Sequence, residues 1–338
     1  MPHTTAVVIL NWNGVDQLRT FLPSVITHTP NAEIIVADNA STDISVEWIQ
    51  QNYPSVRIIT LNQNYGYAGG YNQALKSVDA DYLVLLNSDV EVTEDWLQPL
   101  VQTFETNPAV AACQPKIRSY REKKVFEYAG AAGGYIDQYG IPFCKGRVFH
   151  ELEEDTNQYN QAAEIFWASG ACIAVRNDIF KRIGGFDADF FAHMEEIDLC
   201  WTIHRMGYSI QYIPESLVYH VGAATLKKDN PKKTFLNFRN SLWMLQKHLP
   251  SNKLFPVIFL RMCLDGLAGL HYLSKGQWRQ CLAVFNAHMS FYFSAKNKGK
   301  RKRLKQLPFY YTDVPVILSK SLIWAYYIRG KKVFNQLF

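Results

Sequence analysis

The chain has 338 residues and a formal net charge of +5, which conceals two regions of opposite charge. Residues 1–226 hold 14 Lys and Arg against 27 Asp and Glu, a formal charge of −13, whereas residues 227–338 hold 21 against 3, a charge of +18. The six cysteines are scattered without CxxC spacing, which argues against a zinc site or a disulfide framework. The charge split predicts an acidic domain, 1–226, and a basic region, 227–338, that meets a polyanion such as a membrane surface or nucleic acid.

Strand and helix patterns alternate along the first third of the chain. Short apolar runs predict strands, and apolar residues three or four positions apart predict helices. The predicted strands are 6–10, 33–37, 56–60, 82–86 and 109–113, and the predicted helices are 16–27, 44–50, 68–78 and 93–106. Such alternation is typical of βαβ units around a mostly parallel sheet.

The rest of the acidic domain is less regular. Five glycines and an acidic stretch punctuate residues 114–163, which predicts a long loop region over a cleft. Beyond it, the sequence predicts a strand at 173–175, a helix ending at Gly184, a helix at 198–206, and strands at 209–213 and 217–220.

The basic region contains two apolar segments, 254–273 and 316–328, and both are interrupted by charged residues. A membrane-spanning helix needs ~20 predominantly apolar residues, and charges near its centre are costly. We therefore expect amphipathic helices in the membrane interface, with the basic run 296–305 attracted to anionic lipid. The alternative is an ordinary helical subdomain with a solvated basic loop.

Polar residues follow three of the predicted strands. Asn11 and Trp12 follow the first strand, Asp38 the second, and Asn87-Ser88-Asp89 the run 82–86. In open α/β sheets, ligands bind beyond the carboxyl ends of the strands. Asp38 can accept from the N3–H of uracil or thymine, Trp12 can cover a base face, and Asp89 can hold a divalent cation beside a diphosphate. The alternative is turn and capping chemistry.

A glycine-rich segment, 62–72, precedes the helix predicted at 68–78. Glycines at such a place let the backbone approach a ligand and expose amides to phosphate. The segment is neither GxGxxG nor a Walker A loop, so the dinucleotide and ATP signatures are absent.

Three carboxylates, Glu195, Glu196 and Asp198, stand together after an aromatic run. Adjacent carboxylates repel, which raises the pKa of at least one and suits it as a general base. The alternative is favourable charge at a helix N-terminus. His220 ends the last predicted strand, where a divalent ion near Asp89 would want a second protein ligand.

Seven segments within residues 5–222, in order, resemble family 2 glycosyltransferases of the GT-A fold, and most closely the rhamnosyltransferase type that builds bacterial surface polysaccharides. They are VVILNWNG, VADNASTD, NYGYAGGYN, LLNSDV, WASGACIAVR, GGFDADFFAHMEEIDLCW and GYSIQYIPESLVYH. The resemblance implies a Rossmann-like, mostly parallel sheet flanked by helices. It also implies inverting, metal-dependent transfer from a nucleotide-diphospho-sugar (dTDP-rhamnose or a UDP-hexose) to a hydroxyl of a lipid-linked or polysaccharide acceptor.

The resemblance further implies roles for individual residues. Glu196 is the expected catalytic base, with Glu195 as a competing assignment, and Asp89 and His220 are the expected ligands of Mg²⁺ or Mn²⁺. The remaining expected residues are Asn11, Trp12, Asp38, Asn64, Gly69, Asn87, Ser88 and Asp89 on the donor side, and Trp167, Ser169, Gly170 and His193 on the acceptor side. The chain departs from the family pattern at two of these positions, since Asn87 replaces an acidic residue and Glu196 replaces Asp.

The expected location is cytoplasmic and peripheral on the inner face of the plasma membrane, because residues 1–10 lack the features of a signal peptide. Two alternatives remain at this stage. One is a non-catalytic nucleotide-sugar binder, and the other is a nucleic-acid-binding protein that acts through region 227–338. No nucleic-acid-binding motif is present, and the aromatic content of that region favours a membrane, so no nucleic acid is expected as partner.

Overall fold

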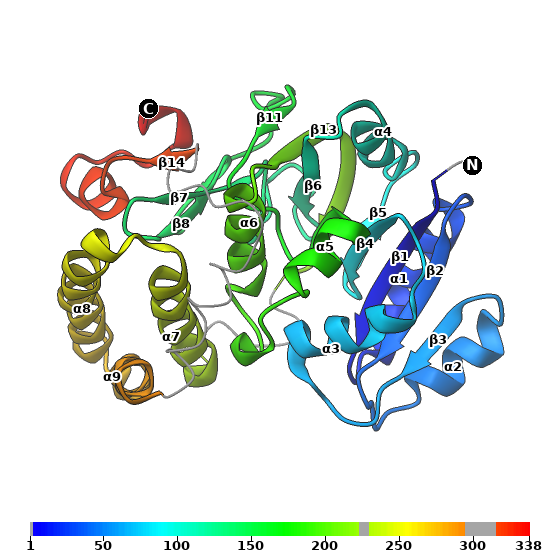
Figure 1. The fold of residues 1–338 in the computed structure, drawn as a ribbon, viewed down its shortest axis with the longest axis horizontal. Coiled ribbons are helices and arrows are strands. Elements are labelled where there is room, and N and C mark those ends of the chain that lie inside the picture. Colours follow the sequence, from blue (N-terminus) through cyan, green and yellow to red (C-terminus); the bar gives the residue numbers. More distant parts are fainter. Residues whose placement is uncertain (1–2, 223–229, 295–315) are drawn as a thin grey trace.

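The computed structural model of the chain describes residues 3–222, 230–294 and 316–338. The strands of its large sheet are β1 (Thr5–Asn11), β2 (Glu33–Asp38), β3 (Arg57–Thr60), β4 (Tyr82–Asn87), β5 (Val90–Val92), β6 (Val110–Ser119), β11 (Ala163–Glu164), β12 (Cys172–Arg176) and β13 (Ser209–His220). Their order is β11-β13-β6-β12-β4-β1-β2-β3, with β5 paired to β13 (Figure 1). The strands β4, β1, β2 and β3 are parallel, and β12 runs antiparallel between β4 and β6. This is the predicted α/β fold with a mixed sheet.

Helices cover both faces of this sheet. They are α1 (Val15–Thr27), α2 (Ser45–Asn52), α3 (Gly66–Ala74), α4 (Gln98–Thr106), α5 (Asn177–Ile183) and α6 (Glu195–Arg205). In β1, Ala6 and Val8 share a core with α3, α5 and α6, whereas Val7 and Ile9 share the other core with α1, α2 and α4. A strand buried on both faces needs an unbroken apolar run, which is the pattern of residues 82–86.

Two predicted boundaries differ from the structure for local reasons. Helix α4 begins at Gln98 and not at residue 93, because Asp95 has a left-handed φ of 55° that an α-helix excludes. The strands predicted at 209–213 and 217–220 are one strand, β13, whose register shifts between Ile213 and Leu217. Pro214 lies in that shift, where its missing N–H interrupts the ladder.

Much of the segment predicted as a long loop, 114–163, is folded into a second sheet. Its strands are β7 (Gly134–Asp137), β8 (Pro142–Cys144), β9 (Arg147–Val148), β10 (Glu151–Leu152) and β14 (Ile317–Leu318), in the order β10-β9-β8-β7-β14. The pairing of β14 with β7 returns the end of the chain to the acidic domain, where Phe334 is buried against Tyr135. The helix predicted over 316–328 is confirmed only in its second half, since Ile317–Leu318 form β14 and residues 322–328 are helical.

The described part of the basic region adds a layer of helices beside the sheet, α7 (Pro231–His248), α8 (Ser251–Ser274) and α9 (Trp278–Phe293) (Figure 1). Helix α8 confirms the helix predicted at 254–273. The basic run 296–305 lies outside the described residues.

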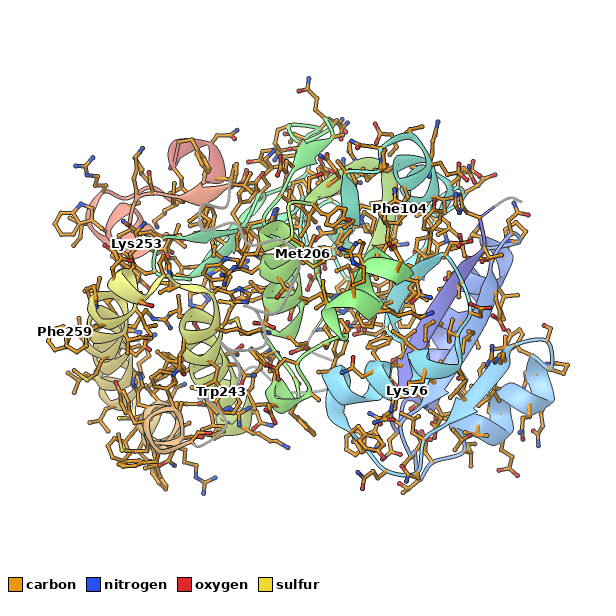
Figure 2. The ribbon with its side chains drawn as sticks, viewed as in Figure 1. Lys76, Phe104, Met206, Trp243, Lys253 and Phe259 are labelled. Atoms are coloured by element: carbon orange, nitrogen blue, oxygen red, sulfur yellow. The ribbon has the colours of Figure 1, made fainter. Side chains whose placement is uncertain are left out.

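Helix α8 buries two charged residues and exposes several apolar ones, which is unusual for a helix of a soluble protein. Arg261 and Asp265 face the protein, where the Arg261 guanidinium donates to Asp265 Oδ1 at 3.2 Å and to Ser241 Oγ at 2.9 Å. His288 Nε2 lies 3.0 Å from Asp265 Oδ2. Phe259, in contrast, is 55% exposed and points away from the molecule (Figure 2). Among the described residues, α8 alone is long and apolar enough to cross a membrane, by length and composition only.

Candidate active site

The predicted donor residues meet at one edge of the sheet, where β1, β2 and β4 end; we call this the carboxyl edge. The register pairs Asn11 with Asp38 and Leu10 with Asn87. Asn11 Nδ2 donates to Asp38 Oδ1 at 3.1 Å, and the Ser41 amide donates to Asp38 Oδ2 at 3.0 Å. These two bonds fix the orientation of the Asp38 carboxylate, which is almost fully buried. A fixed, buried carboxylate of this kind can select a ligand that presents an N–H group.

Trp12 lies at the same edge and is 48% exposed, as a residue that covers a base face must be. Asn64 is held in the neighbouring loop, where its Oδ1 accepts from Asn39 Nδ2 at 3.1 Å and from the Gly66 amide at 2.8 Å. The side chains of Asn11 and Asn64 are therefore both positioned by hydrogen bonds around the predicted base site.

The amides at the start of α3 are engaged with protein and not open to a phosphate. The Phe191 carbonyl accepts from the Tyr67 amide at 2.8 Å and from the Ala68 amide at 3.4 Å. Gly66 has a φ of 72°, and an added Cβ would lie 2.5 Å from the Phe191 oxygen, so the glycine permits this close approach. Gly69 is buried within α3. In this structure the glycine-rich segment, for which we predicted phosphate contacts, therefore packs against the loop before α6.

Asp89 and His220 come together beside Asn87, although they lie 131 positions apart in the sequence. His220 Nε2 is 3.1 Å from Asp89 Oδ1 and 3.4 Å from Asn87 Nδ2, while His220 Nδ1 is 3.5 Å from Glu127 Oε1. Burial alone would lower the pKa of His220, but Glu127 and Asp89 outweigh it and raise this pKa to about 10. Glu127 could not be found from the sequence, because it is a lone buried acid in a segment predicted as loop.

The donor set of Asp89 and His220 fits a divalent metal. Two neighbouring ligands of an octahedral ion with bonds of about 2.1 Å lie about 3 Å apart, which matches the distance between Asp89 Oδ1 and His220 Nε2. A carboxylate beside the far nitrogen of the histidine, here that of Glu127, is a common support for metal-binding histidines. Within the described ranges, no cluster of three or more His, Cys, Asp or Glu side chains is arranged around one ion.

Glu195 and Glu196 begin α6, directly after a backbone segment of unusual conformation. Phe191, His193 and Met194 all have φ between 66° and 73°, a region that residues other than glycine rarely occupy. We call residues 191–194 the base loop. Its shape lets the two glutamates enter the interior at the helix start. The Oε2 atoms of Glu195 and Glu196 and the Nε2 atom of His193 are buried and have no hydrogen-bond partner among the residues that the structure describes.

Burial dominates the electrostatics of this pair. Burial raises the pKa of Glu195 well above its usual value, and the charge of Glu196 adds to this increase. Burial also raises the pKa of Glu196, to about 7. Burial lowers the pKa of His193 to about 4, so this imidazole is neutral. A carboxyl that titrates near neutral pH is suited to accept a proton from a hydroxyl.

The third carboxylate of the cluster has a different role. Asp198 is paired with Lys247 and accepts from His248, whose Nε2 lies 2.8 Å from Asp198 Oδ1. Burial alone would raise the pKa of Asp198, but Lys247 and His248 hold it below its usual range. Asp198 therefore joins α6 to α7 and is not a candidate base.

Tyr67 connects the two groups of carboxylates. Its hydroxyl donates to the Gly170 carbonyl at 2.7 Å, and the next residue, Ala171, accepts from the Asn87 amide at 3.0 Å. Burial raises the pKa of Tyr67 well above its usual value, and the charges of Glu195 and Glu196 add to it, so both carboxylates lie near this ring. Tyr67 and Asn87 therefore both bind the backbone of one loop, 167–171.

The other predicted acceptor-side residues hold this loop in place. Trp167 is buried, its Nε1 donates to the Tyr135 carbonyl at 3.0 Å, and its ring leaves no room for a Cβ at Gly134. Ser169 is also buried, accepts from the Ala171 amide at 3.1 Å and donates to the Ala129 carbonyl. Both side chains are thus buried behind the loop, and their place on the acceptor side stays a prediction. Ser88, by contrast, lies partly exposed at the carboxyl edge.

Asn240 of α7 is a further residue of the site that sequence reasoning missed. Its Nδ2 lies 3.0 Å from the carbonyl oxygens of Phe190 and Ala192 and 2.7 Å from that of His193, and its Oδ1 accepts from Arg239 at 2.8 Å. The side chain is fully buried. Asn240 thus holds the backbone of the base loop in its unusual conformation. The only feature that marks Asn240 in the sequence is its position, because it is a polar residue on the apolar stripe of a helix.

Replacement of Asn240 by Ala is expected to lower kcat while the affinity for the donor stays near that of the wild type, because Glu196 shifts but the carboxyl edge does not. We expect a decrease of roughly 10²-fold, the scale of a 1 Å misplacement of a catalytic group. Steady-state kinetics and calorimetry with donor measure the two effects. Ser241→Ala, which alters a neighbouring buried residue that contacts Arg261 and not the base loop, is the control. An equal loss in both variants would contradict the assignment.

Comparison with known proteins identifies the family of this chain. The profile of the family described as "Glycosyl transferase family 2" matches residues 6–184, more than half of the chain. An N-acetylglucosaminyl-diphospho-decaprenol L-rhamnosyltransferase of Mycobacterium tuberculosis is 27% identical over 247 residues, which cover 68% of this chain and 80% of that protein. The rhamnosyltransferase WbbL of Escherichia coli K12 is 23% identical over 221 residues, which cover 63% of this chain and 82% of the relative.

Two solved structures share the fold. GalNAc-T7, solved with UDP, GalNAc and Mn²⁺, superposes with a TM-score of 0.59 at 18% identity, covering 74% of this chain and 49% of that one, so this chain spans about half of its length. The mannosyltransferase PcManGT of Pyrobaculum calidifontis, solved with GDP-Man and Mn²⁺, gives a TM-score of 0.53 at 15% identity, covering 87% and 88%. The fold is therefore of the GT-A kind, and the chain belongs to glycosyl transferase family 2.

Proposed function

We propose that this glycosyltransferase moves a sugar from a nucleotide-diphospho-sugar to a hydroxyl of a lipid-linked glycan, with inversion at the anomeric carbon. The observation that supports the proposal is the pair of Asp89 and His220 at the carboxyl edge, together with two buried glutamates, Glu195 and Glu196, whose pKa values are raised by burial. A leaving diphosphate and an attacking hydroxyl need opposite kinds of help, namely positive charge and a proton acceptor.

The donor would lie across the carboxyl edge. Asp38 would accept from the N3–H of a uracil or thymine base, and Trp12 would cover that base. Asp89 and His220 would hold Mg²⁺ or Mn²⁺, which supplies the positive charge that neutralises a diphosphate leaving group. Both solved neighbours carry Mn²⁺ with a nucleotide or nucleotide-sugar, which supports this use of a metal. Asn87, which replaces an acid, leaves fewer protein charges on the ion.

Glu196 would accept the proton of the acceptor hydroxyl, which attacks the anomeric carbon from the face opposite the diphosphate. One displacement inverts that centre. Glu195, deeper and with a pKa raised further, would stay protonated at neutral pH. The names of the relatives suggest rhamnose as the sugar and a polyprenyl-diphosphate-linked sugar as the acceptor.

A screen of dTDP-, UDP- and GDP-sugars by thermal shift, with and without Mn²⁺, tests the donor class. A nucleotide that binds the folded state raises the Tm by mass action, and we expect a metal-dependent increase with dTDP- or UDP-sugars. Release of the nucleotide diphosphate in the same mixtures would exclude a non-catalytic binder. Absence of any Tm increase and of any sugar transfer would contradict the proposal.

The basic region would dock the enzyme on the cytoplasmic face of the membrane. Helices α8 and α9 carry an outer apolar face, which consists of the exposed residues Phe255, Phe259, Leu267, Leu270, Trp278 and Phe285. Since Arg261 and Asp265 bind the rest of the protein, α8 would lie in the interface and not span the bilayer. Nearby Lys275, which is exposed at the end of α8, would attract anionic lipid.

The double substitution Phe259→Glu with Leu270→Glu is expected to abolish binding to anionic vesicles, because it places two charges on the outer apolar face. Liposome flotation at low and high salt measures this, and wild-type binding should weaken as salt rises. Gln102→Glu with Thr106→Glu, at two exposed positions of α4, adds the same two charges elsewhere and is the control. No flotation of the wild type at low salt would reject membrane docking, and a gel shift with DNA or RNA would then favour the nucleic-acid alternative.

A further inference from the structure

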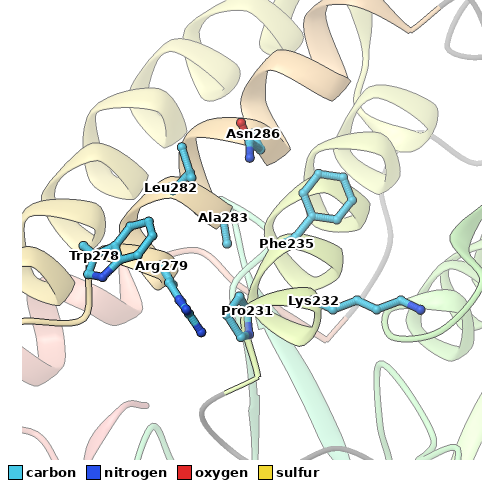
Figure 3. A pocket seen from close by; sticks show the side chains of 8 residues that line it. All are labelled: Pro231, Lys232, Phe235, Trp278, Arg279, Leu282, Ala283 and Asn286. Carbon is cyan, nitrogen blue, oxygen red and sulfur yellow. The ribbon is translucent and has the colours of Figure 1, made fainter.

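A groove of about 370 Å³ lies between α7 and α9, away from the carboxyl edge (Figure 3). Phe235, Leu282 and Ala283 form much of its apolar lining, Trp278 stands at one end, and Lys232 and Arg279 supply positive charge. Its volume is within the range of small-molecule sites, roughly 300–1,000 Å³. Neither helix contains an acidic residue, so no carboxylate of α7 or α9 neutralises these cations.

The groove opens onto the outer apolar face. Trp278 and Leu282 line it, and both side chains are about half exposed, while Phe285 follows on the same helix. A hydrocarbon chain could therefore pass from a lipid surface into the groove without crossing polar surface. Arg279 lies beside Trp278 on one side of the groove, and Lys232 extends from α7 on the other side (Figure 3). An apolar lining flanked by cations matches a molecule that has a hydrocarbon tail and an anionic head.

The groove also adjoins the base loop. Lys232, which lines the groove, places its ammonium 4.9 Å from the centre of the Phe191 ring. The neighbouring Lys233 is close enough to His193 to lower the pKa of that imidazole further, after the larger effect of burial. Phe191 and His193 are separated from Glu195 by only a few residues. The end of the groove that carries Lys232 thus lies beside the base loop, which precedes the two candidate bases.

We propose that this groove binds the lipid and phosphate part of the acceptor, a polyprenyl chain joined to a diphosphate, and so presents the attached sugar hydroxyl to Glu196. The inference rests on the proposed function for the identity of the reaction, but the binding site itself is independent of sugar transfer. Lys232 and Arg279 would pair with the diphosphate, and Phe235, Trp278 and Leu282 would contact the first isoprene units. The outer apolar face would hold the rest of the chain in the membrane interface.

Equilibrium binding of farnesyl diphosphate to the full-length protein, measured by calorimetry, tests the groove. Farnesol and inorganic diphosphate serve as probes of the tail and the head alone. We expect farnesyl diphosphate to bind more tightly than either, and Arg279→Glu and Leu282→Glu each to weaken its binding roughly tenfold or more. Both substituted side chains are exposed, so the variants should fold, which their Tm values would verify. Lys253→Glu makes the same charge change on α8 outside the groove and should bind as the wild type does.

Three results would overturn the inference. The first is wild-type affinity for farnesyl diphosphate in both groove variants, and the second is an equal loss in Lys253→Glu. The third is that inorganic diphosphate binds as tightly as farnesyl diphosphate. The hydrocarbon tail would then contribute nothing, and the probe would bind at a phosphate site and not in the groove. Nucleotide binding with Mn²⁺ should be unchanged in the groove variants. If the groove binds the probe as expected but the wild type transfers sugar to no acceptor, the proposed function fails while the groove assignment stands.

Discussion

Replacement of Glu196 by Gln is expected to lower kcat by roughly 10²–10⁴-fold, the contribution typical of a general base. Gln keeps the size of the side chain but cannot accept a proton, so the affinity for a nucleotide-sugar with Mn²⁺ should stay close to that of the wild type. Transfer assays and calorimetry on the same preparation separate the two quantities. The variant should also be no less stable than the wild type at pH 8, because burying a neutral amide avoids burying a charge.

The same assignment predicts a pH dependence. Burial raises the pKa of Glu196 to about 7, and the base acts only when it is deprotonated, so the kcat of the wild type should rise as the pH increases through this value. Glu195→Gln provides the matched control one position away. Full activity in Glu196→Gln together with a large loss in Glu195→Gln would transfer the role to Glu195, and full activity in both would remove the base from this loop.

Replacement of Asp89 by Ala is expected to abolish the Mn²⁺-dependent part of donor binding and to lower kcat by roughly 10²–10³-fold, the cost of losing one group that stabilises transition-state charge. Asp89 and His220 form one donor set, with Oδ1 and Nε2 separated by 3.1 Å, so His220→Gln should produce the same kind of defect. Calorimetry with nucleotide, titrated with and without Mn²⁺, gives the direct comparison.

Asp16→Ala is the matched control for Asp89→Ala, since it removes an exposed aspartate of α1 that contacts only Arg19 among the ion pairs of the described residues. It should leave metal-dependent binding unchanged. Unaltered donor affinity in Asp89→Ala, with the metal effect intact, would refute a metal at this position. Loss of binding both with and without metal would instead indicate that Asp89 supports the fold of the carboxyl edge.

The sequence predicts those parts of the fold that have a strong local signal. The run 82–86 is apolar because β4 is buried on both faces, and the polar triplet Asn87–Asp89 marks the end of that strand. The second sheet lacks such a signal, because its strands are two to four residues long and are separated by glycines. Strand β14, which pairs with β7, lies about 180 positions further along the chain. A pairing of only two residues leaves no pattern that can be detected in the sequence.

The residues of the candidate site also fall into two groups, those with a local signal in the sequence and those without one. Asp38, Asp89, Glu196 and His220 follow strands or begin a helix, so their placement can be inferred from chain order. The supporting contacts cannot be inferred, because they join segments that are distant in sequence. The amides at the start of α3 donate to the carbonyl of Phe191, which lies more than 120 residues further along the chain. The sequence does not reveal this contact, so we expected the amides to be open to phosphate. Asn240 reaches the base loop from the basic region, so that region contributes to the active site as well as to the predicted surface.

A crystal structure of the protein with a nucleotide-sugar analogue and Mn²⁺, with the ion located by its anomalous scattering, tests the central claim most directly. We predict an anomalous peak bound by Asp89, His220 and the diphosphate, with the base beside Asp38 and the anomeric carbon turned toward Glu196. Mn²⁺ or nucleotide bound away from the carboxyl edge, or a sugar that cannot reach either glutamate, would contradict it.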